Sequence, residues 1–203
     1  MRITATALFG LESTVRDDML RLGFNKENIT VNDGRADVEV IQSEVPLACA
    51  RLNMNLRTAE RVLITYGSGR AETFDELFSI ALQIPWEEII PYGWAFHVNG
   101  YSLKSKLFGI PSCQSIIKKA IVTRIGRSRN PGDSFVIPED QSKGLYKIVF
   151  SIIKDNVSFM ADTSGDGLHK RGYRPLTHTA PLKETLAAGL VRSEEHTSEL
   201  QSR

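Results

Sequence analysis

The chain has 203 residues, 41% of them hydrophobic, and its 25 basic and 24 acidic residues give a formal net charge of +1. This length and apolar content exclude a disordered or fibrous chain and favour two small domains. No apolar run reaches the roughly 20 residues that cross a bilayer, and no secretory signal is evident, so we expect a cytoplasmic protein without a membrane partner. Cys49 and Cys113 lie far apart without CxxC spacing. We predict that both are small buried residues and expect neither a disulfide framework nor a metal site.

The nearly neutral total hides an uneven distribution of charge. Residues 89–132 contain seven basic residues and no acidic one, and residues 167–183 contain four basic residues and no acidic one. The rest of the chain has more acidic than basic side chains. Two acid-free basic segments in an otherwise acidic chain are typical of a surface that binds a polyanion.

The first third of the chain alternates between strand and helix patterns. Asp33-Gly34 tolerates the positive φ of a tight hairpin turn, and Ser43 is a candidate helix N-cap with Pro46 in the first turn. The order strand, helix, hairpin, helix, strand predicts a ferredoxin-like domain. The expected elements are strands at residues 3–9, 29–31, 38–41 and 61–66, the last closed by Gly67, Ser68 and Gly69, and helices at 12–22 and 43–53.

The next region predicts a second mixed domain. Thr73 and Ser112 are candidate N-caps of two helices, and Pro85 ends the first of them. We expect Trp86, Tyr92 and Trp94 to pack in the core, with a base-stacking platform as the alternative. The expected elements are helices at residues 73–83 and from 112 onward, a short strand at 95–98, and strands at 145–153 and 157–162 that form a hairpin about 154–156.

The last twelve residues, 192–203 (RSEEHTSELQSR), have no apolar periodicity. They resemble the translation of a sequencing-adapter oligonucleotide, whereas the alternative is an ordinary charged tail. We therefore treat this stretch as an adapter-derived artefact and exclude it from the reasoning about the fold.

Three separated stretches resemble one family. Residues 161–190 (ADTSGDGLHKRGYRPLTHTAPLKETLAAGL) are similar to the junction between the THUMP module and the catalytic domain of bacterial enzymes that methylate guanine N2 of large-subunit ribosomal RNA. Residues 52–63 (LNMNLRTAERVL) and 74–86 resemble the same family. The resemblance implies an α+β chain with a ferredoxin-like domain (1–70), a THUMP RNA-binding domain (71–165), and a linker with the first helix of a truncated Rossmann-like methyltransferase domain (166–191).

The resemblance also implies a cofactor, S-adenosylmethionine, in the full-length parent. The family holds it with a strand followed by Asp-x-x-x-Gly-x-Gly and catalyses with a motif similar to Asn-Pro-Pro-Tyr, and neither occurs in this sequence. Asn130-Pro131 precedes Gly132 and fits a turn instead. We therefore expect no catalytic residue, no cofactor bound to this chain and an inactive fragment. Pro181 and Leu182 correspond to a lip beside the cofactor in the family, and the alternative for them is a plain helix start.

The first basic segment supplies the main candidates for contacts with RNA phosphates. Such contacts are largely independent of sequence and sensitive to salt, because each one releases condensed counterions. The alternative is a helix whose solvent face happens to be basic. The candidates are Lys104, Lys106, Lys118, Lys119, Arg124, Arg127 and Arg129.

The second basic segment adds His169, Lys170, Arg171, Tyr173 and Arg174. They form either an RNA clamp, in which guanidinium groups bind phosphate and Tyr173 stacks, or a structural linker. In the second case we expect the basic side chains to pair with Asp162 or Asp166. Both interpretations stay open at the level of the sequence.

The resemblance and the charge pattern together predict the RNA-binding portion of an S-adenosylmethionine-dependent ribosomal RNA guanine-N2 methyltransferase. The expected partner is structured RNA of the 23S type, and no obligate protein partner is evident. The alternatives are a stand-alone RNA-binding module and a fragment of another THUMP-containing, tRNA-modifying enzyme.

Overall fold

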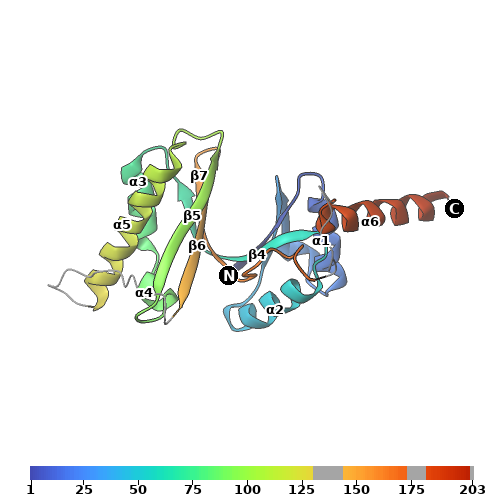
Figure 1. The fold of residues 1–203 in the computed structure, drawn as a ribbon, viewed down its shortest axis with the longest axis horizontal. Coiled ribbons are helices and arrows are strands. Elements are labelled where there is room, and N and C mark those ends of the chain that lie inside the picture. Colours follow the sequence, from blue (N-terminus) through green and yellow to red (C-terminus); the bar gives the residue numbers. More distant parts are fainter. Residues whose placement is uncertain (130–143, 173–181, 202–203) are drawn as a thin grey trace. The chain divides into compact units, whose positions relative to one another are not determined.

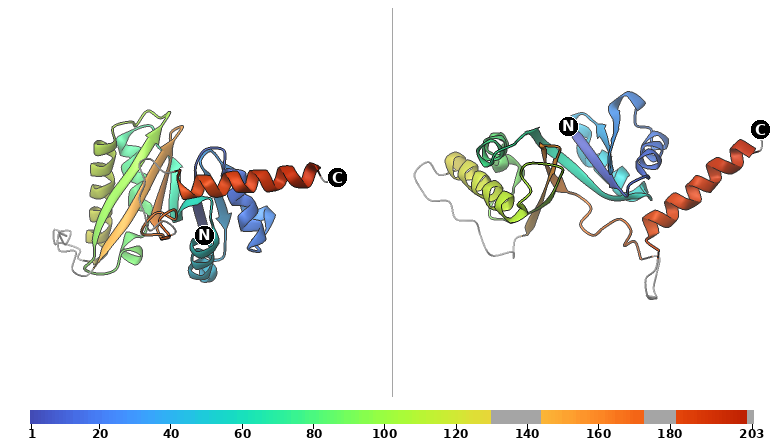
Figure 2. Two further views of the ribbon diagram at one scale, coloured as in Figure 1. Left: turned by 45° about the vertical axis from the view of Figure 1, so that its right-hand side comes forward. Right: turned by 90° about the horizontal axis from the view of Figure 1, so that it is seen from above.

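The computed structural model describes residues 1–129, 144–172 and 182–201, with only the backbone for Arg129 and residues 193–201. The chain divides into two compact units. Unit 1 contains Met1–Ile64 and Asp162–Arg203, and unit 2 contains Thr65–Ala161. Each unit has its own hydrophobic core, and Figures 1 and 2 show the elements that make up the two units.

Unit 1 has the predicted ferredoxin-like order of elements. Its strands run in the order β2-β3-β1-β4, and β1 pairs antiparallel with β3, so that Ile3 lies opposite Val38. Gly34 has a φ of 72° in the β2–β3 turn, as the Asp-Gly dipeptide predicts. The elements are β1 (Arg2–Ala7), α1 (Glu12–Arg21), β2 (Ile29–Asn32), β3 (Arg35–Glu39), α2 (Val45–Asn55) and β4 (Ala59–Arg70), with 3₁₀ turns at Lys26–Asn28 and Gln42–Glu44.

The core of unit 1 joins α1 and α2 to the sheet. Met19 of α1 and Leu52 of α2 are fully buried in one cluster with Ile3, Val38 and Val62. The same cluster contains Cys49, which confirms the prediction for that residue.

Unit 2 places three helices on one face of its sheet (Figure 1). The strands run in the order β4-β7-β6-β5, with β5 parallel to β6 and β6 antiparallel to β7. A parallel pair needs a long crossover connection, and α5 lies in the connection between β5 and β6. The elements are α3 (Phe74–Gln83), α4 (Trp86–Ile89), β5 (Ala95–Leu103), α5 (Ile110–Arg129), β6 (Leu145–Ile153) and β7 (Asn156–Asp162).

The core of unit 2 is built on aromatic and β-branched residues. Trp86 is fully buried and meets Phe159 edge to face, with 6.3 Å between ring centroids. Cys113 is also fully buried. Core packing is thus confirmed for Trp86 and Cys113, whereas Tyr92 is 79% exposed and the core prediction is wrong for it.

The structure confirms one predicted helix cap and corrects two. Thr73 and Glu76 form a capping box at the start of α3. Ser43 instead lies within the 3₁₀ turn before α2, whose N-cap is Glu44. Helix α5 begins at Ile110, two residues before Ser112, because Pro111 fits the first helical turn, where its missing N–H has no helical partner.

Strand β4 passes through the glycines that were predicted to close it. A Cβ on Gly67 would lie 2.7 Å from Ile84 Cδ1, and a Cβ on Gly69 would lie 2.9 Å from Ile80 Cδ1. The glycines therefore permit close packing of the strand against the end of α3 and the residue after it, instead of making a turn. Strand β5 likewise extends beyond the predicted residue 98, to Leu103.

Helix α6 (Glu184–Gln201) belongs to unit 1. A Cβ on Gly189 would lie 2.5 Å from Leu11 Cδ2, so this part of α6 packs against the residue that precedes α1. In the part of the chain that the structure describes, none of the helices combines the length and the apolar character needed to cross a membrane.

Candidate nucleic-acid interface

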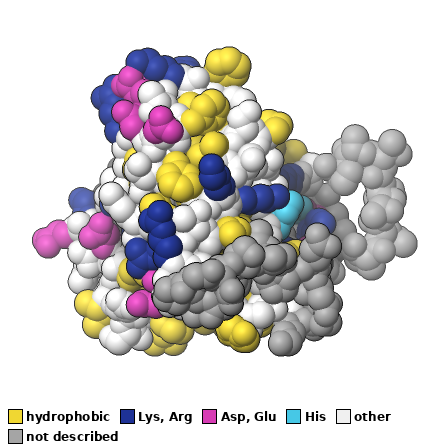
Figure 3. Space-filling model, turned by 90° about the vertical axis from the view of Figure 1, so that its left-hand side faces the viewer, with side chains coloured by type: hydrophobic (Ala, Val, Ile, Leu, Met, Phe, Trp, Pro, Cys, Tyr) yellow, Lys and Arg dark blue, Asp and Glu magenta, His cyan; other side chains and the backbone are white. Residues whose placement is uncertain are grey.

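Helix α5 carries most of the first basic segment on the outer side of unit 2. Ile117 and Ile121 are fully buried on the side of the helix that faces the core, so the opposite side faces solvent. Lys119 and Arg127 are exposed as a result, while Lys118 is half-buried. Figure 3 looks onto this side of the molecule and shows dark-blue basic side chains on it, with magenta acidic ones at the upper left, at the left edge and at the lower left.

Two of the predicted phosphate-binding residues form ion pairs within unit 2. Arg124 donates from Nε to both Glu87 carboxylate oxygens at 3.0 Å and from Nη2 to Oε1 at 2.8 Å. These hydrogen bonds raise the pKa of the Arg124 guanidinium. Lys106 pairs with Glu72, which also accepts from Arg70 at 2.7 Å. Both acids lie outside residues 89–132, so an acid count within that segment could not find them.

The remaining described cations of this segment are available to a ligand. Lys104, Lys118, Lys119 and Arg127 form no ion pair with any residue that the structure describes. Lys104 lies directly after β5, and the other three lie on α5. The Arg129 side chain lies outside the described residues. Four described cations of this segment therefore remain as candidates for contacts with RNA. We call them the α5 cations, and the name includes Lys104, which precedes the helix.

Arg171, from the second basic segment, closes the end of a helix in unit 1. Its guanidinium donates from Nη1 to the Met54 carbonyl at 2.8 Å, and from Nη2 to the carbonyls of Asn53 at 2.8 Å and Leu56 at 2.6 Å. Its Nε donates to Leu168 O at 3.0 Å. The last carbonyls of a helix lack partners within the helix, so this guanidinium satisfies groups at the C-terminal end of α2. Four of its five N–H donors are used, three at the end of α2 and one on Leu168 O.

Other residues of the second segment surround Glu60 of unit 1. His169 Nδ1 lies 3.6 Å from Glu60 Oε2, and Lys183 pairs with the same carboxylate. Burial by itself would raise the pKa of Glu60, but hydrogen bonds from Lys183 and Thr185 outweigh it and lower the pKa. These contacts support the structural-linker interpretation.

The partners that were expected for a structural linker are nevertheless different. Asp162 pairs with Arg61 of β4, and with none of the basic side chains after it that the structure describes. Lys170 is exposed, and Leu182 is 47% exposed. Tyr173, Arg174 and Pro181 lie outside the described residues, so their predicted roles stay predictions.

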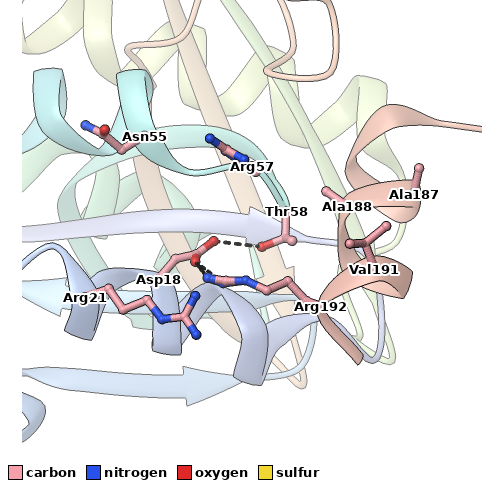
Figure 4. A pocket seen from close by; sticks show the side chains of 9 residues that line it. All are labelled: Asp18, Arg21, Asn55, Arg57, Thr58, Ala187, Ala188, Val191 and Arg192. Atoms are coloured by element: carbon pink, nitrogen blue, oxygen red, sulfur yellow. Dashed lines mark hydrogen bonds and ion pairs between the residues drawn. The ribbon is translucent and has the colours of Figure 1, made fainter. Parts of the chain in front are cut away.

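Unit 1 also contains a cavity of about 550 Å³ (Figure 4). Burial raises the pKa of Asp18 in its wall, although Arg192 donates to the Asp18 carboxylate at 2.7 Å. Because we expect Arg192 to be adapter-derived, we assign no ligand to this cavity. Its lining residues are Asp18, Arg21, Asn55, Arg57, Thr58, Ala187, Ala188, Val191 and Arg192.

Two family models match the chain, one within unit 1 and one largely within unit 2. The RlmL ferredoxin-like domain matches residues 2–63, and the THUMP domain matches residues 71–162. The chain contains an RlmL ferredoxin-like domain and a THUMP domain. The ferredoxin-like and THUMP folds predicted from the sequence are thereby confirmed.

Curated relatives of this THUMP chain include RNA methyltransferases. "Putative RNA methyltransferase YpsC" of Bacillus subtilis is 40% identical over 190 residues, which cover 94% of this chain and 47% of that protein. "Ribosomal RNA large subunit methyltransferase K/L" of Colwellia psychrerythraea is 36% identical over 146 residues, which cover 70% of this chain and 19% of that protein. The chain therefore spans about half of YpsC and a smaller share of the K/L enzyme.

Solved structures give the same picture of the THUMP chain. A protein from Listeria monocytogenes, described as a "predicted N6-adenine-specific DNA methylase", is 43% identical with a TM-score of 0.80, and the match covers 94% of this chain and 47% of that one. SMU.472, described as a "putative methyltransferase complexed with SAH", is 36% identical with a TM-score of 0.80, and the match covers 94% and 48% of the two chains.

Proposed function

We propose that this chain is the RNA-binding portion of an S-adenosylmethionine-dependent methyltransferase that modifies guanine N2 of 23S-type ribosomal RNA. The observation that carries the proposal is the set of α5 cations, which lack ion-pair partners among the described residues and lie within the residues that match the THUMP domain. The names of YpsC and of the K/L enzyme favour RNA over DNA as the substrate. With ribosomal RNA as the substrate, the cytoplasm is the proposed compartment.

The α5 cations suit structured RNA on physical grounds. A double-stranded RNA helix presents phosphates and 2′-hydroxyl groups more readily than base edges, so a protein can recognise it by charge and shape. Three cations on the solvent-facing surface of a helix and one in the loop before it would neutralise several phosphates without reading a sequence. We therefore expect broad affinity for structured RNA and place the choice of nucleotide in the catalytic part of the parent.

Catalysis is assigned to residues of the parent that this chain lacks. The sequence contains neither the Asp-x-x-x-Gly-x-Gly loop nor the Asn-Pro-Pro-Tyr-like motif of the family. In the parent, S-adenosylmethionine would supply the methyl group, with Pro181 and Leu182 beside it. We expect this chain to bind no S-adenosylmethionine in calorimetry and to transfer no methyl group to RNA.

A salt titration tests the RNA-binding part of the proposal. The chain is titrated into a labelled ribosomal RNA hairpin, and binding is followed by fluorescence anisotropy. With four phosphate contacts, the affinity should fall about a hundredfold between about 50 and 200 mM monovalent salt. No binding at low salt, or an affinity that does not change with salt, would overturn the proposal.

A further inference from the structure

The loop between β5 and α5 exposes a phenylalanine just before α5 begins, four positions after Lys104. Phe108 is 82% exposed, the highest value of any large apolar side chain that the structure describes. Its neighbour Leu107 is 5% exposed and belongs to the core of unit 2. Single exposed apolar side chains are common on protein surfaces, so the case for a ligand at Phe108 depends on the groups beside it.

Hydrogen bonds hold this loop in one conformation. Ser105 Oγ donates to Leu103 O at 2.9 Å and accepts from Asp155 N at 3.0 Å. The Asp155 carboxylate in turn accepts from Lys106 N at 2.8 Å. On the other side of Phe108, the chain enters α5 directly. The ring therefore projects from a segment fixed at both ends, so little conformational entropy would be lost when it contacts a ligand.

Lys104 lies in the same loop with an unusual backbone. Its φ of 51° falls in the left-handed region, which residues other than glycine rarely adopt. The same region is occupied by Lys154 and Asp155 in the β6–β7 turn, so this φ marks a tight turn that holds Lys104 in the loop. Lys104 is exposed and, as one of the α5 cations, forms no ion pair with a described residue, whereas Lys106 two positions later is paired with Glu72.

The charges around the loop decide which kind of ligand fits. The acids at this end of unit 2 already have partners: Glu72 is paired with Lys106 and Arg70, Glu76 serves the capping box of α3, and Asp155 of the β6–β7 turn accepts from Lys106 N at 2.8 Å. On the α5 side, residues 89–132 contain no acid, and Glu87 of α4 is paired with Arg124. A ligand that approaches from α5 thus meets an aromatic ring and unpaired cations, which are the groups that bind single-stranded nucleic acid.

We propose that Phe108 is a stacking platform for an unpaired base of the RNA and that Lys104 binds a phosphate next to that base. This inference rests on the proposed RNA-binding function and specifies its substrate as structured RNA that contains unpaired nucleotides. Phenylalanine has no hydrogen-bonding group, so stacking on it would not select one base over another.

The test compares two RNA hairpins of equal length, one fully paired and one with a bulge of unpaired nucleotides. Their dissociation constants are measured for the full chain and for Phe108→Ala, Phe108→Tyr and Phe9→Ala. We expect the unchanged chain to prefer the bulged hairpin by about tenfold, as stacking of one base would give. Phe108→Ala should remove this preference and keep the affinity for the paired hairpin, whereas Phe108→Tyr should restore it.

Phe9→Ala is the matched control, because Phe9 is 77% exposed but lies in unit 1. Its hairpin preference should equal that of the unchanged chain. A preference that survives Phe108→Ala overturns the stacking proposal while RNA binding stands. Phe108→Ala could instead change the self-association of the chain, measured by light scattering, and leave both RNA affinities unchanged. Phe108 would then be a contact between copies of the chain, and the proposal would be wrong. Failure of the unchanged chain to bind even the paired hairpin would contradict the proposed function itself.

Discussion

The two basic segments look alike in the sequence and differ in the structure. In the segment that follows unit 2, Arg171 is bonded to the carbonyls at the end of α2, and His169 and Lys183 surround Glu60. In the segment on unit 2, Arg124 and Lys106 are paired, but Lys104, Lys118, Lys119 and Arg127 are not paired with described residues. One segment is therefore largely used by the fold, and the other leaves several charges for a ligand.

This difference shows that counting charged residues along the sequence does not reveal which cations are paired in the fold. A run without acids indicates that no acid is near in the sequence, but a carboxylate such as Glu87 reaches Arg124 across 37 positions. Backbone carbonyls at a helix end can also bind a guanidinium without contributing to any charge count. The availability of a cation is decided by its neighbours in space.

The largest effect is expected from Arg171→Ala. It removes three hydrogen bonds to carbonyls at the end of α2 and one to Leu168 O, and should destabilise unit 1 by about 3 kcal/mol, because hydrogen bonds from a charged donor are among the stronger ones. Faster amide hydrogen exchange in α2 would report this loss. Both tryptophans, Trp86 and Trp94, belong to unit 2, so the fluorescence-detected unfolding of that unit should stay unchanged.

Lys170→Ala is the control for this variant, because the Lys170 side chain is exposed one position earlier. It should leave the exchange of α2 as it is. If Arg171→Ala weakened RNA binding without altering hydrogen exchange, the linker interpretation would be wrong and the RNA clamp would be favoured.

A smaller effect is expected from the double charge reversal Lys118→Glu/Lys119→Glu. The loss of two phosphate contacts should lower the affinity for the paired hairpin about tenfold or more and reduce the slope of log affinity against log salt by about 2. Fluorescence anisotropy over a salt series measures both quantities.

The matched control is Lys26→Glu, an exposed lysine of unit 1. It should change the affinity only slightly. Because Lys26→Glu reverses one charge and the double variant reverses two, a loss of log affinity half as large would mean that total charge, and not the surface of α5, governs binding. Unaltered tryptophan fluorescence is required to show that unit 2 remains folded, since Lys118 is half-buried.

The smallest effect is expected from Arg124→Ala. It removes a partly exposed ion pair with Glu87 and should lower the stability of unit 2 by about 1 kcal/mol. Trp86 adjoins Glu87 in α4, so urea unfolding followed by tryptophan fluorescence measures the change directly.

Arg127→Ala should show the opposite pattern, with unchanged stability and a reduced affinity for RNA. The pair of variants thus separates a structural cation from a ligand-binding one on the same helix. A loss of affinity in Arg124→Ala as large as that in Arg127→Ala would show that Arg124 leaves Glu87 to bind RNA.

The sequence predicted those parts of the fold that depend on neighbouring residues. The hairpin about Lys154 and Asp155 formed where polar residues interrupt two alternating strands, and both residues adopt positive φ values of 51° and 65°. The Thr73 N-cap also formed as predicted, and Glu76, three positions later, completes a capping box with it. Local chemistry suffices for such features.

The errors arose where a distant element decides the role of a residue. From the sequence, Gly67 and Gly69 are predicted to end a strand. In the structure they are residues of β4, and their lack of a side chain makes room for Ile84 and Ile80. The start of α5 was placed at Ser112 on the capping preference of serine, and the fixed φ of Pro111 moved it forward to Ile110. Neither Ile84 nor Ile80 could be matched to a particular glycine from spacing alone.

For the binding surface, the sequence by itself determined that two acid-free basic segments exist and that one of them lies on an amphipathic helix of a THUMP-like domain. Only the tertiary structure decided which of these cations have partners, because ion pairs and helix caps form between residues that are far apart in the chain. It also decided that Leu107 is buried while Phe108 faces solvent, since the packing of α5 and β5 fixes which side of their connecting loop enters the core.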